Sequence, residues 1–239
     1  MADIVRAPGR LSTSLWPEPP SLLRWTGLCA AAESIGMTAS SAAARVADTA
    51  VGDRPTTTPV ALAALAIIVT GGLVEGIALG IAQARGLGDW LTGRRGGWIA
   101  VTVVVAGIGW AAASAPAVLS PADGGEEPTP VLLLGAAAGL GLVMGAMLGV
   151  AQSLVLRGRV PHRWRWTGAS ALGWLVAMPI VFGGATLPGG QWPLPAVITV
   201  GAVTGLVAGG AFGVISGSLL PSLVVRPARP SPDRPPAPV

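Results

Sequence analysis

The chain has 239 residues, of which 51% are hydrophobic and only 11% are charged. A soluble globular domain carries about 25% charged residues, so this composition excludes a soluble fold and predicts an all-α integral membrane protein. The formal net charge is +4, and every basic side chain is an arginine. Because the arginines lie in short loops and not on one basic surface, a nucleic-acid partner is excluded as well.

Six apolar segments are predicted to cross the bilayer as helices, since each is long enough for a hydrocarbon core about 30 Å thick. The first is the least apolar, because it contains several Ser and Thr residues and one glutamate. The high glycine content of the segments is compatible with membrane helices, where small residues allow close packing. In chain order the predicted spans are 22–44, 58–84, 98–119, 131–156, 166–187 and 194–220.

These spans divide the chain into three hairpins with polar ends. Residues 1–21 are predicted to form a polar cytoplasmic segment, which lacks the apolar stretch of a cleavable secretory signal. The Pro/Arg-rich tail 221–239 is predicted to be disordered and cytoplasmic. Between them, hairpin repeat 1 covers 22–84, a cytoplasmic loop with repeat 2 covers 85–156, and a loop with repeat 3 covers 157–220.

Two motifs occur three times each and alternate along the chain, which is typical of an internal repeat of about 70 residues. A tryptophan opens each odd span, at Trp25, Trp98 and Trp166. Each even span carries a ladder of glycines spaced by four and then a polar residue: Gly72, Gly76 and Gly80 before Gln83; Gly141, Gly145 and Gly149 before Gln152; Gly205, Gly209 and Gly213 before Ser216. Two spans per unit give every copy the same orientation, so the sequence predicts three parallel hairpin repeats in a pseudo-three-fold bundle.

Glycines spaced by four lie along one helix face and let a neighbouring helix approach closely. If the even helices face one another, their ladders form a packed centre. If they face the odd helices instead, the centre can be open. We expect the packed centre. Three two-helix repeats also resemble the outline of mitochondrial carriers, but the Pro-x-acid-x-x-basic motif of that family is missing, so the resemblance implies no function.

Arginine placement predicts the orientation of the hairpins, because cytoplasmic loops carry an excess of basic residues. The side that holds both termini contains thirteen of the fifteen arginines. Both termini are therefore predicted to be cytoplasmic, in the plasma or inner cell membrane. The residues expected at the lipid interface of that side are Trp25, Trp98, Trp164, Trp166, Arg157, Arg159, Arg163 and Arg165.

Two acids lie inside the predicted spans, Glu33 and Glu75. At 1.5 Å per residue they lie about 12 Å and about 15 Å from the cytoplasmic face, at a similar depth on the two helices of one hairpin. Close carboxyls in a low dielectric do not both ionise cheaply, so the pair is a candidate for sharing a proton or holding a cation. The alternative is that each carboxyl is protonated and forms a hydrogen bond to a neighbour that holds two helices together. The matching positions of the other repeats hold Trp174, Met144 and Ala208, so the acids belong to the first repeat alone.

Other polar residues offer weaker candidates. Gln83, Gln152 and Ser216 are candidates for the polar lining of a vestibule, with helix capping or interhelical bonding as the alternative. His162 has no Cys or His partner in the sequence, so no metal site is predicted, and Cys29 is expected to be a small packing residue. The sequence has no nucleophile–base set and no phosphate-binding loop, so neither an enzyme nor a cofactor is predicted.

These patterns favour a polytopic membrane protein that serves as a structural or accessory subunit and packs through its glycine-ladder helices. Its expected partners are the lipid bilayer and either a second copy of the chain or a membrane complex. The alternative function is a small proton- or cation-coupled transporter or channel that uses the intramembrane acid pair.

Overall fold

The computed structural model describes residues 17–51, 57–119, 129–189 and 191–224, and the regular secondary structure in these ranges is helical. Two short 3-10 helices, η1 (Gly88–Leu91) and η2 (Leu220–Leu223), follow the second and sixth long helices. The long helices are α1 (Leu22–Val51), α2 (Thr58–Leu87), α3 (Arg95–Leu119), α4 (Pro130–Val155), α5 (Arg165–Ala185) and α6 (Leu194–Leu219).

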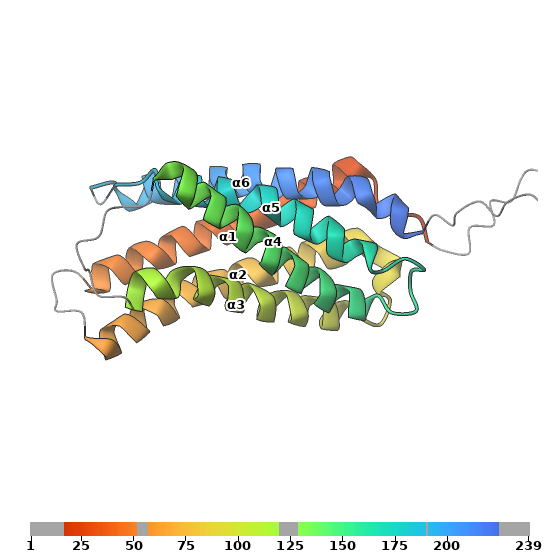
Figure 1. Cartoon of the computed structure of the whole chain (residues 1–239), viewed down its shortest axis with the longest axis horizontal. Coiled ribbons are helices and arrows are strands. Elements are labelled where there is room, and N and C mark those ends of the chain that lie inside the picture. The colour runs from red at the N-terminus through yellow and green to blue at the C-terminus, as the bar shows by residue number, and fades with distance from the viewer. Residues whose placement is uncertain (1–16, 52–56, 120–128, 190, 225–239) are drawn as a thin grey trace, which may run out of the picture.

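The long helices run up and down beside one another in a single elongated bundle (Figure 1). Each helix contacts its neighbours in the chain, and α1 also packs extensively against α6, so the bundle closes as a ring. The contact between α3 and α4 is the smallest in this ring. Helix α1 begins and α6 ends at the same end of the bundle (Figure 1), here named the tryptophan end because Trp25, Trp98 and Trp166 cluster there.

Five helices, α2 to α6, are long and apolar enough to cross a membrane. Little of their apolar surface is covered by protein; in α3 only 11% of the most apolar window is buried within the bundle. Lipid can solvate such a surface and water cannot, so the length and composition of these helices indicate a membrane protein.

Helix α1 forms over its whole predicted span and continues to Val51, but it is not among the five apolar helices. It lies between α2 and α6, and its polar residues Glu33 and Ser40 are buried against its neighbours. The prediction of six membrane spans is therefore supported by composition for five helices. Protein contacts, and not lipid, cover the polar face of α1, the remaining helix.

Local signals explain where the helices begin and end. Each even helix has a proline in its first turn, where a missing N–H breaks no helical hydrogen bond: Pro59, Pro130 and Pro195. Gly88 and Gly158 have φ angles of 53° and 72° and turn the chain after α2 and α4. Glycine adopts this conformation without a steric penalty, so both turns form close to the ends of the helices.

The chain between and beyond the helices is more closely packed than predicted. In the predicted loop after α2, Trp90 is buried, and its Nε1 donates to the carbonyl oxygen of Pro17 at 2.9 Å. Leu223 of η2 is also buried, and its carbonyl oxygen accepts from the backbone N–H of His162 at 3.1 Å. The prediction of a disordered tail is wrong for 221–224, because these residues seal the tryptophan end; the rest of that prediction lies outside the described residues.

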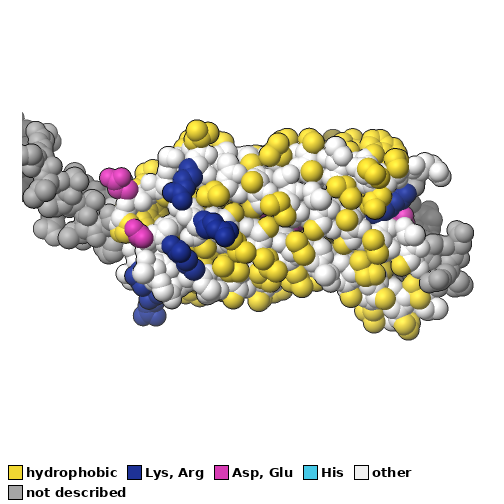
Figure 2. Space-filling model, turned by 180° about the vertical axis from the view of Figure 1, so that it is seen from behind, with side chains coloured by type: hydrophobic (Ala, Val, Ile, Leu, Met, Phe, Trp, Pro, Cys, Tyr) yellow, Lys and Arg dark blue, Asp and Glu magenta, His cyan; other side chains and the backbone are white. Residues whose placement is uncertain are grey.

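Basic side chains gather at the tryptophan end, and hydrophobic side chains cover much of the length of the bundle (Figure 2). Of the arginines that the structure describes, Arg45 alone lies at the opposite end, near the end of α1. The two ends of the bundle therefore differ in charge, as the arginine pattern of the sequence indicates.

The glycine ladders do not meet at the centre. The ladder of α2 packs on α3, the ladder of α4 packs on α5, and the ladder of α6 packs on α1. The approach is close: a methyl group at Gly145 would lie 2.7 Å from the carbonyl oxygen of Ser170, and one at Gly209 would lie 2.6 Å from that of Cys29. The prediction of a centre packed by the three ladders is wrong, because each groove is filled by the backbone of an odd helix.

The contact between α6 and α1 indicates what selects these partners. Short connections can bring α2 to α3 and α4 to α5, since neighbouring elements in a chain tend to pack together. Helices α6 and α1 lie at the two ends of the described chain and yet make the most extensive contact in the bundle. Their pairing depends on the fit between the ladder and the facing helix.

Substitution of adjacent glycines in α6 tests the ladder contact. We expect Gly209→Ala to lower the free energy of unfolding by about 1–3 kcal/mol, as overpacking of a filled interior does. Gly210→Ala is the matched control, because nothing lies within 4 Å of the added methyl group, and we expect little change. Unfolding in mixed detergent micelles, followed by helical circular dichroism, measures both. Equal stability of the two variants would contradict the close contact.

Candidate functional site

A buried polar layer crosses the bundle at the tryptophan end. Three hydrogen bonds link an odd helix to an even helix in the same way, with an indole Nε1 donating to the polar residue that follows a glycine ladder. They run from Trp98 to Gln83 (3.1 Å), from Trp166 to Gln152 (2.8 Å) and from Trp25 to Ser216 (2.9 Å). In each case the two helices are the pair that the ladder joins.

Gln152 is the hub of this layer. Its Nε2 donates to Gln83 Oε1 at 3.0 Å and to Thr102 Oγ1 at 2.9 Å, so one amide connects four helices. The rings add to the contact, since the centroid of Trp166 lies 5.7 Å from that of Trp25 and 5.8 Å from that of Trp98. Polar bonds and ring packing together close the interior at this end.

The layer changes the roles expected from the sequence. Gln83, Gln152 and Ser216 are fully buried and bonded between helices, so the prediction that they line a vestibule is wrong. Trp25, Trp98 and Trp166 are also fully buried, so the prediction that they contact lipid is wrong as well. Their N–H groups find partners inside the bundle. Trp164 does face outward and is 51% exposed.

The arginines predicted at the lipid interface bind backbone at the tryptophan end. Arg159 Nη2 donates to the carbonyl oxygen of Thr92 at 2.7 Å, and Arg165 Nη1 donates to that of Ser222 at 2.9 Å. The guanidinium of Arg163 lies 5.0 Å from the ring centroid of Trp164. Arg157 is exposed, and its carbonyl oxygen accepts from Arg94 at 2.6 Å. These contacts hold the loops together, and lipid binding by the same side chains stays a prediction.

The two acids lie deeper in the bundle. Glu33 of α1 and Glu75 of α2 are 1% and 7% exposed. The side chain of Glu75 packs against Gly36, about one helical turn along α1 from Glu33. The structure therefore brings the two acids of the first repeat together.

Hydrogen bonding differs between the two carboxyls. Glu75 Oε2 accepts from Trp110 Nε1 at 3.0 Å. Neither side-chain oxygen of Glu33 has a hydrogen-bond partner in the described part of the chain, although its Cβ and Cγ pack closely on Gly209. Buried polar atoms are nearly always bonded, so the carboxyl of Glu33 calls for a partner other than the described residues. Interhelical bonding of the carboxyl, the alternative role, is not found for Glu33.

A central cavity of about 320 Å³ lies beside Glu75, and Glu33 is not among the residues that line it. Helices α1 to α5 all contribute to its wall, which places it inside the ring. Glu75 is the one ionisable residue in its lining, and most of the others are apolar. The aromatic members of the lining are Trp110, Trp174 and Phe182.

The cavity is closed at one end and extends toward the other. Thr102, which accepts the hydrogen bond from Gln152, lines it on the side of the polar layer. Val118, near the end of α3, lines it on the opposite side. The two residues are about 24 Å apart along a helix that rises 1.5 Å per residue. The cavity therefore runs from beneath the polar layer toward the end of the bundle that lacks the tryptophans.

Matching positions of the predicted repeats meet at this cavity. Glu75 and Met144 directly precede the central glycine of their ladders, and both line the wall. Ala106 and Trp174 stand eight residues after Trp98 and Trp166, as Glu33 stands after Trp25, and both also line it. The wall of the cavity thus has an acid on one side and mostly apolar groups on the others.

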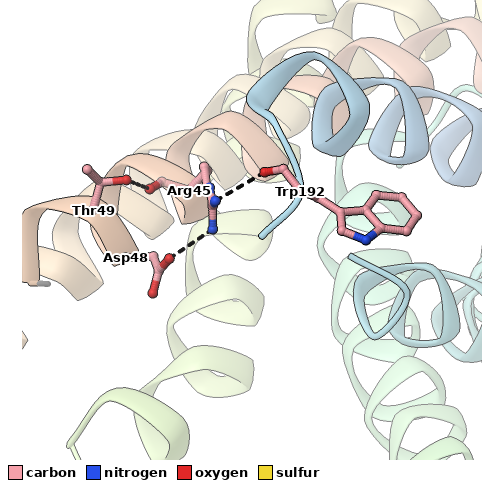
Figure 3. Close-up of polar contacts among 4 residues, drawn as sticks. All are labelled: Arg45, Asp48, Thr49 and Trp192. Atoms are coloured by element: carbon pink, nitrogen blue, oxygen red, sulfur yellow. Dashed lines mark hydrogen bonds and ion pairs between the residues drawn. The ribbon is translucent and has the colours of Figure 1, made fainter. Parts of the chain in front are cut away.

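A second cavity, also of about 320 Å³, lies between α1, α5 and α6 and is named the end cavity here. Arg45 at its margin bonds to Asp48 Oδ2 at 3.1 Å and donates to the carbonyl oxygen of Trp192 at 3.1 Å (Figure 3). The guanidinium therefore ties α1 to the connection between α5 and α6. Met37, Ala44 and Ala185 line both cavities, so only a thin wall separates them.

Sequence reasoning missed several polar atoms of the interior. Trp110 was detectable, because a tryptophan in the middle of a span departs from the usual interfacial position. Trp174, whose buried N–H has no partner in the described chain, lies in mid-span as well. The buried and unbonded hydroxyl groups of Thr26, Ser40 and Ser170 gave no sequence signal. Among the described residues no group of three or more His, Cys, Asp and Glu side chains is placed to hold a metal ion.

Removal of the hub tests the polar layer. We expect Gln152→Leu to lower the free energy of unfolding by about 1–3 kcal/mol, because the buried N–H of Trp166 is left unbonded. Gln191→Leu, at an exposed position between α5 and α6, is the matched control with little expected effect. Adding Trp166→Phe to Gln152→Leu should cost less than the sum of the single changes. Strict additivity in detergent unfolding would contradict the hydrogen bond.

The length and composition of its helices thus indicate a membrane protein, with a hydrogen-bonded polar layer at one end and two buried acids, of which Glu75 lines a cavity and Glu33 has no hydrogen-bond partner in the described residues. No protein-family model matches it, and neither a curated protein nor a solved structure matches it.

Proposed function

We propose that the protein is a small multi-pass transporter of a proton or a monovalent cation, and that Glu33 and Glu75 form its binding site. The observation that carries the proposal is Glu33, whose carboxyl is buried and has no hydrogen-bond partner in the described part of the chain. An isolated buried carboxylate is very unfavourable, so this group must hold a proton, bind a cation or do both in turn.

The second carboxyl favours exchange over permanent protonation. Two carboxyls that share a site titrate as a pair, and only one of them ionises readily. Glu75 lines the central cavity and is held by the N–H of Trp110, so it can meet an incoming cation in a fixed position. Arrival of a cation at the pair would then be linked to departure of a proton from it.

The shape of the cavity favours a transporter with alternating access and not a continuously open pore. It extends from the acid pair toward the end opposite the tryptophans, whereas the polar layer around Gln152 closes the other side. Passage through the bundle requires this layer to open. In transporters built from repeats, such a change is a movement of helices around a site near the middle of the membrane.

We place the tryptophan end in the cytoplasm, with both termini on that side of the cell membrane. The arginines gathered at this end support the orientation, since basic loops stay inside. We further propose that α1 spans the bilayer with the other helices, as three hairpins around an approximate three-fold axis. Three equivalent indole bonds and three ladder contacts support that arrangement.

The same contacts weigh against an accessory subunit that packs through its glycine ladders. Such a subunit needs ladder faces that are free for a partner. Here the ladders of α2, α4 and α6 are covered by α3, α5 and α1 of the same chain. A partner protein would have to bind another surface.

Ion flux into reconstituted vesicles tests the proposal. A potassium gradient with valinomycin sets the membrane potential, a trapped pH-sensitive dye reports proton entry, and tracer sodium reports a metal cation. We expect vesicles with the wild-type protein to show a greater flux of protons or of sodium than protein-free vesicles. Glu33→Gln should reduce that flux to the protein-free level, because the carboxyl that binds the ion is gone.

Glu18→Gln is the matched control, since this exposed acid lies before α1 and away from the pair. It should transport as the wild type does. Circular dichroism and gel filtration of each variant separate loss of flux from loss of fold. A wild-type flux equal to that of empty vesicles, or a flux that Glu33→Gln leaves unchanged in folded protein, would contradict the proposal.

A further inference from the structure

We infer that the central cavity binds a monovalent organic cation with an aromatic or otherwise apolar body, and that its charge is met by Glu75. The inference rests on the proposed function, because it uses the same carboxyl pair and names the class of cation. It follows from the chemistry of the wall, from the indole fixed beside the carboxyl, and from the cavity's size.

The wall is unsuited to a small metal cation. Hard cations are held by several oxygen ligands at once. The cavity offers the carboxyl of Glu75 and the hydroxyls of Thr102 and Ser114, and the hydroxyl of Thr102 is already bonded to Gln152. The remaining side chains that line the cavity are apolar or aromatic and cannot replace the water that such an ion must shed. An organic cation keeps its charge on a carbon framework and needs only one counter-charge.

The same wall suits an apolar body. Trp110 is fixed beside the carboxyl by its 3.0 Å hydrogen bond to Glu75, and indole rings are the best aromatic partners for cations. Trp174 and Phe182 also line the cavity, and so do the adaptable thioethers of Met144 and Met178. An aromatic group here would replace water against surfaces that water solvates poorly.

Size agrees with this assignment. The volume of about 320 Å³ is at the lower end of the range found for small-molecule pockets. Such a cavity takes one ring with a cationic head and is too small for a large ligand.

Binding of a permanent cation should compete with a proton. The ligand needs an ionised carboxyl, so one proton leaves the pair for solvent as the cation enters, and no covalent bond changes. Glu33 is the ionisable group of α1 about one turn from the contact of Glu75 with Gly36, and Cys29 lies about one turn before Glu33. From α3 the indole of Trp110 faces it, and residues 98–119 carry no charge. Affinity should therefore rise with pH.

Equilibrium dialysis with protein in nanodiscs of phosphatidylcholine tests the inference, with empty nanodiscs as the baseline. The probe is benzyltrimethylammonium, which does not titrate. Tetramethylammonium supplies the charge without the ring, and benzyl alcohol supplies the ring without the charge. We expect the probe to bind about tenfold or more tightly than either, since both parts of the wall are needed.

Variants identify the site. Glu75→Gln should weaken binding of the probe by about tenfold or more, and Glu18→Gln should leave it unchanged. Phe182→Leu, on the wall away from the acid pair, should weaken binding of the probe but not binding of tetramethylammonium. This variant keeps the test valid if Glu75→Gln does not fold. Binding no greater than in empty nanodiscs, or binding that folded Glu75→Gln does not weaken, would overturn the inference, as would equal binding of tetramethylammonium.

The flux assay separates the two proposals. If flux depends on Glu33 while the probe neither binds nor inhibits flux, the organic-cation site is wrong and the transport function stands. If the probe binds in a manner that depends on Glu75 while wild-type vesicles show no flux, the site stands and the transport function is wrong.

Discussion

The contact between a glycine ladder and the backbone of an odd helix is the constraint on which the rest of the structure depends. A glycine face lets two helices approach until backbone meets backbone, as between Gly209 and the carbonyl oxygen of Cys29. At that distance the register of the two helices is set, because any side chain on the ladder would clash. The indole of Trp25 then reaches Ser216, and the two other tryptophans reach their glutamines in the same way.

Buried polar groups in this bundle fall into two kinds. Helices α2, α3 and α5 each contribute a donor or an acceptor to the side chain of Gln152. The low dielectric of the interior strengthens these hydrogen bonds. Glu33 lies in the same interior without a bonded partner in the described chain. The low dielectric that stabilises the first kind makes the second unfavourable. The hydrogen bonds of the polar layer join the helices at the tryptophan end, whereas the carboxyl of Glu33 is buried without such a bond to the described residues.

Asymmetry among similar segments creates the site. The position eight residues after the opening tryptophan holds Glu33, Ala106 and Trp174 in the three odd helices. Ala106 and Trp174 face the central cavity, and Glu75 faces it from α2. A bundle with the same residue at all three positions would have either three buried acids or none. Ala106 and Trp174 belong to the apolar part of the wall, and the carboxyl of the wall comes from Glu75 of an even helix, since Glu33 does not line the cavity.

The sequence by itself determined the number of helices, their approximate ends and the class of protein, and it put two acids at a similar depth. Those properties follow from local composition: apolar length, prolines at helix starts, glycines at turns and spacing along one helix. Which face meets which neighbour was decided only by the tertiary structure. A ladder facing α3 and one facing another even helix have the same spacing, and the closure of α6 on α1 joins residues at opposite ends of the chain. The contact of α6 with α1 buries Trp25 and the side chain of Glu33, whose carboxyl has no hydrogen-bond partner in the described residues. Packing between distant segments is not encoded in the period of either one.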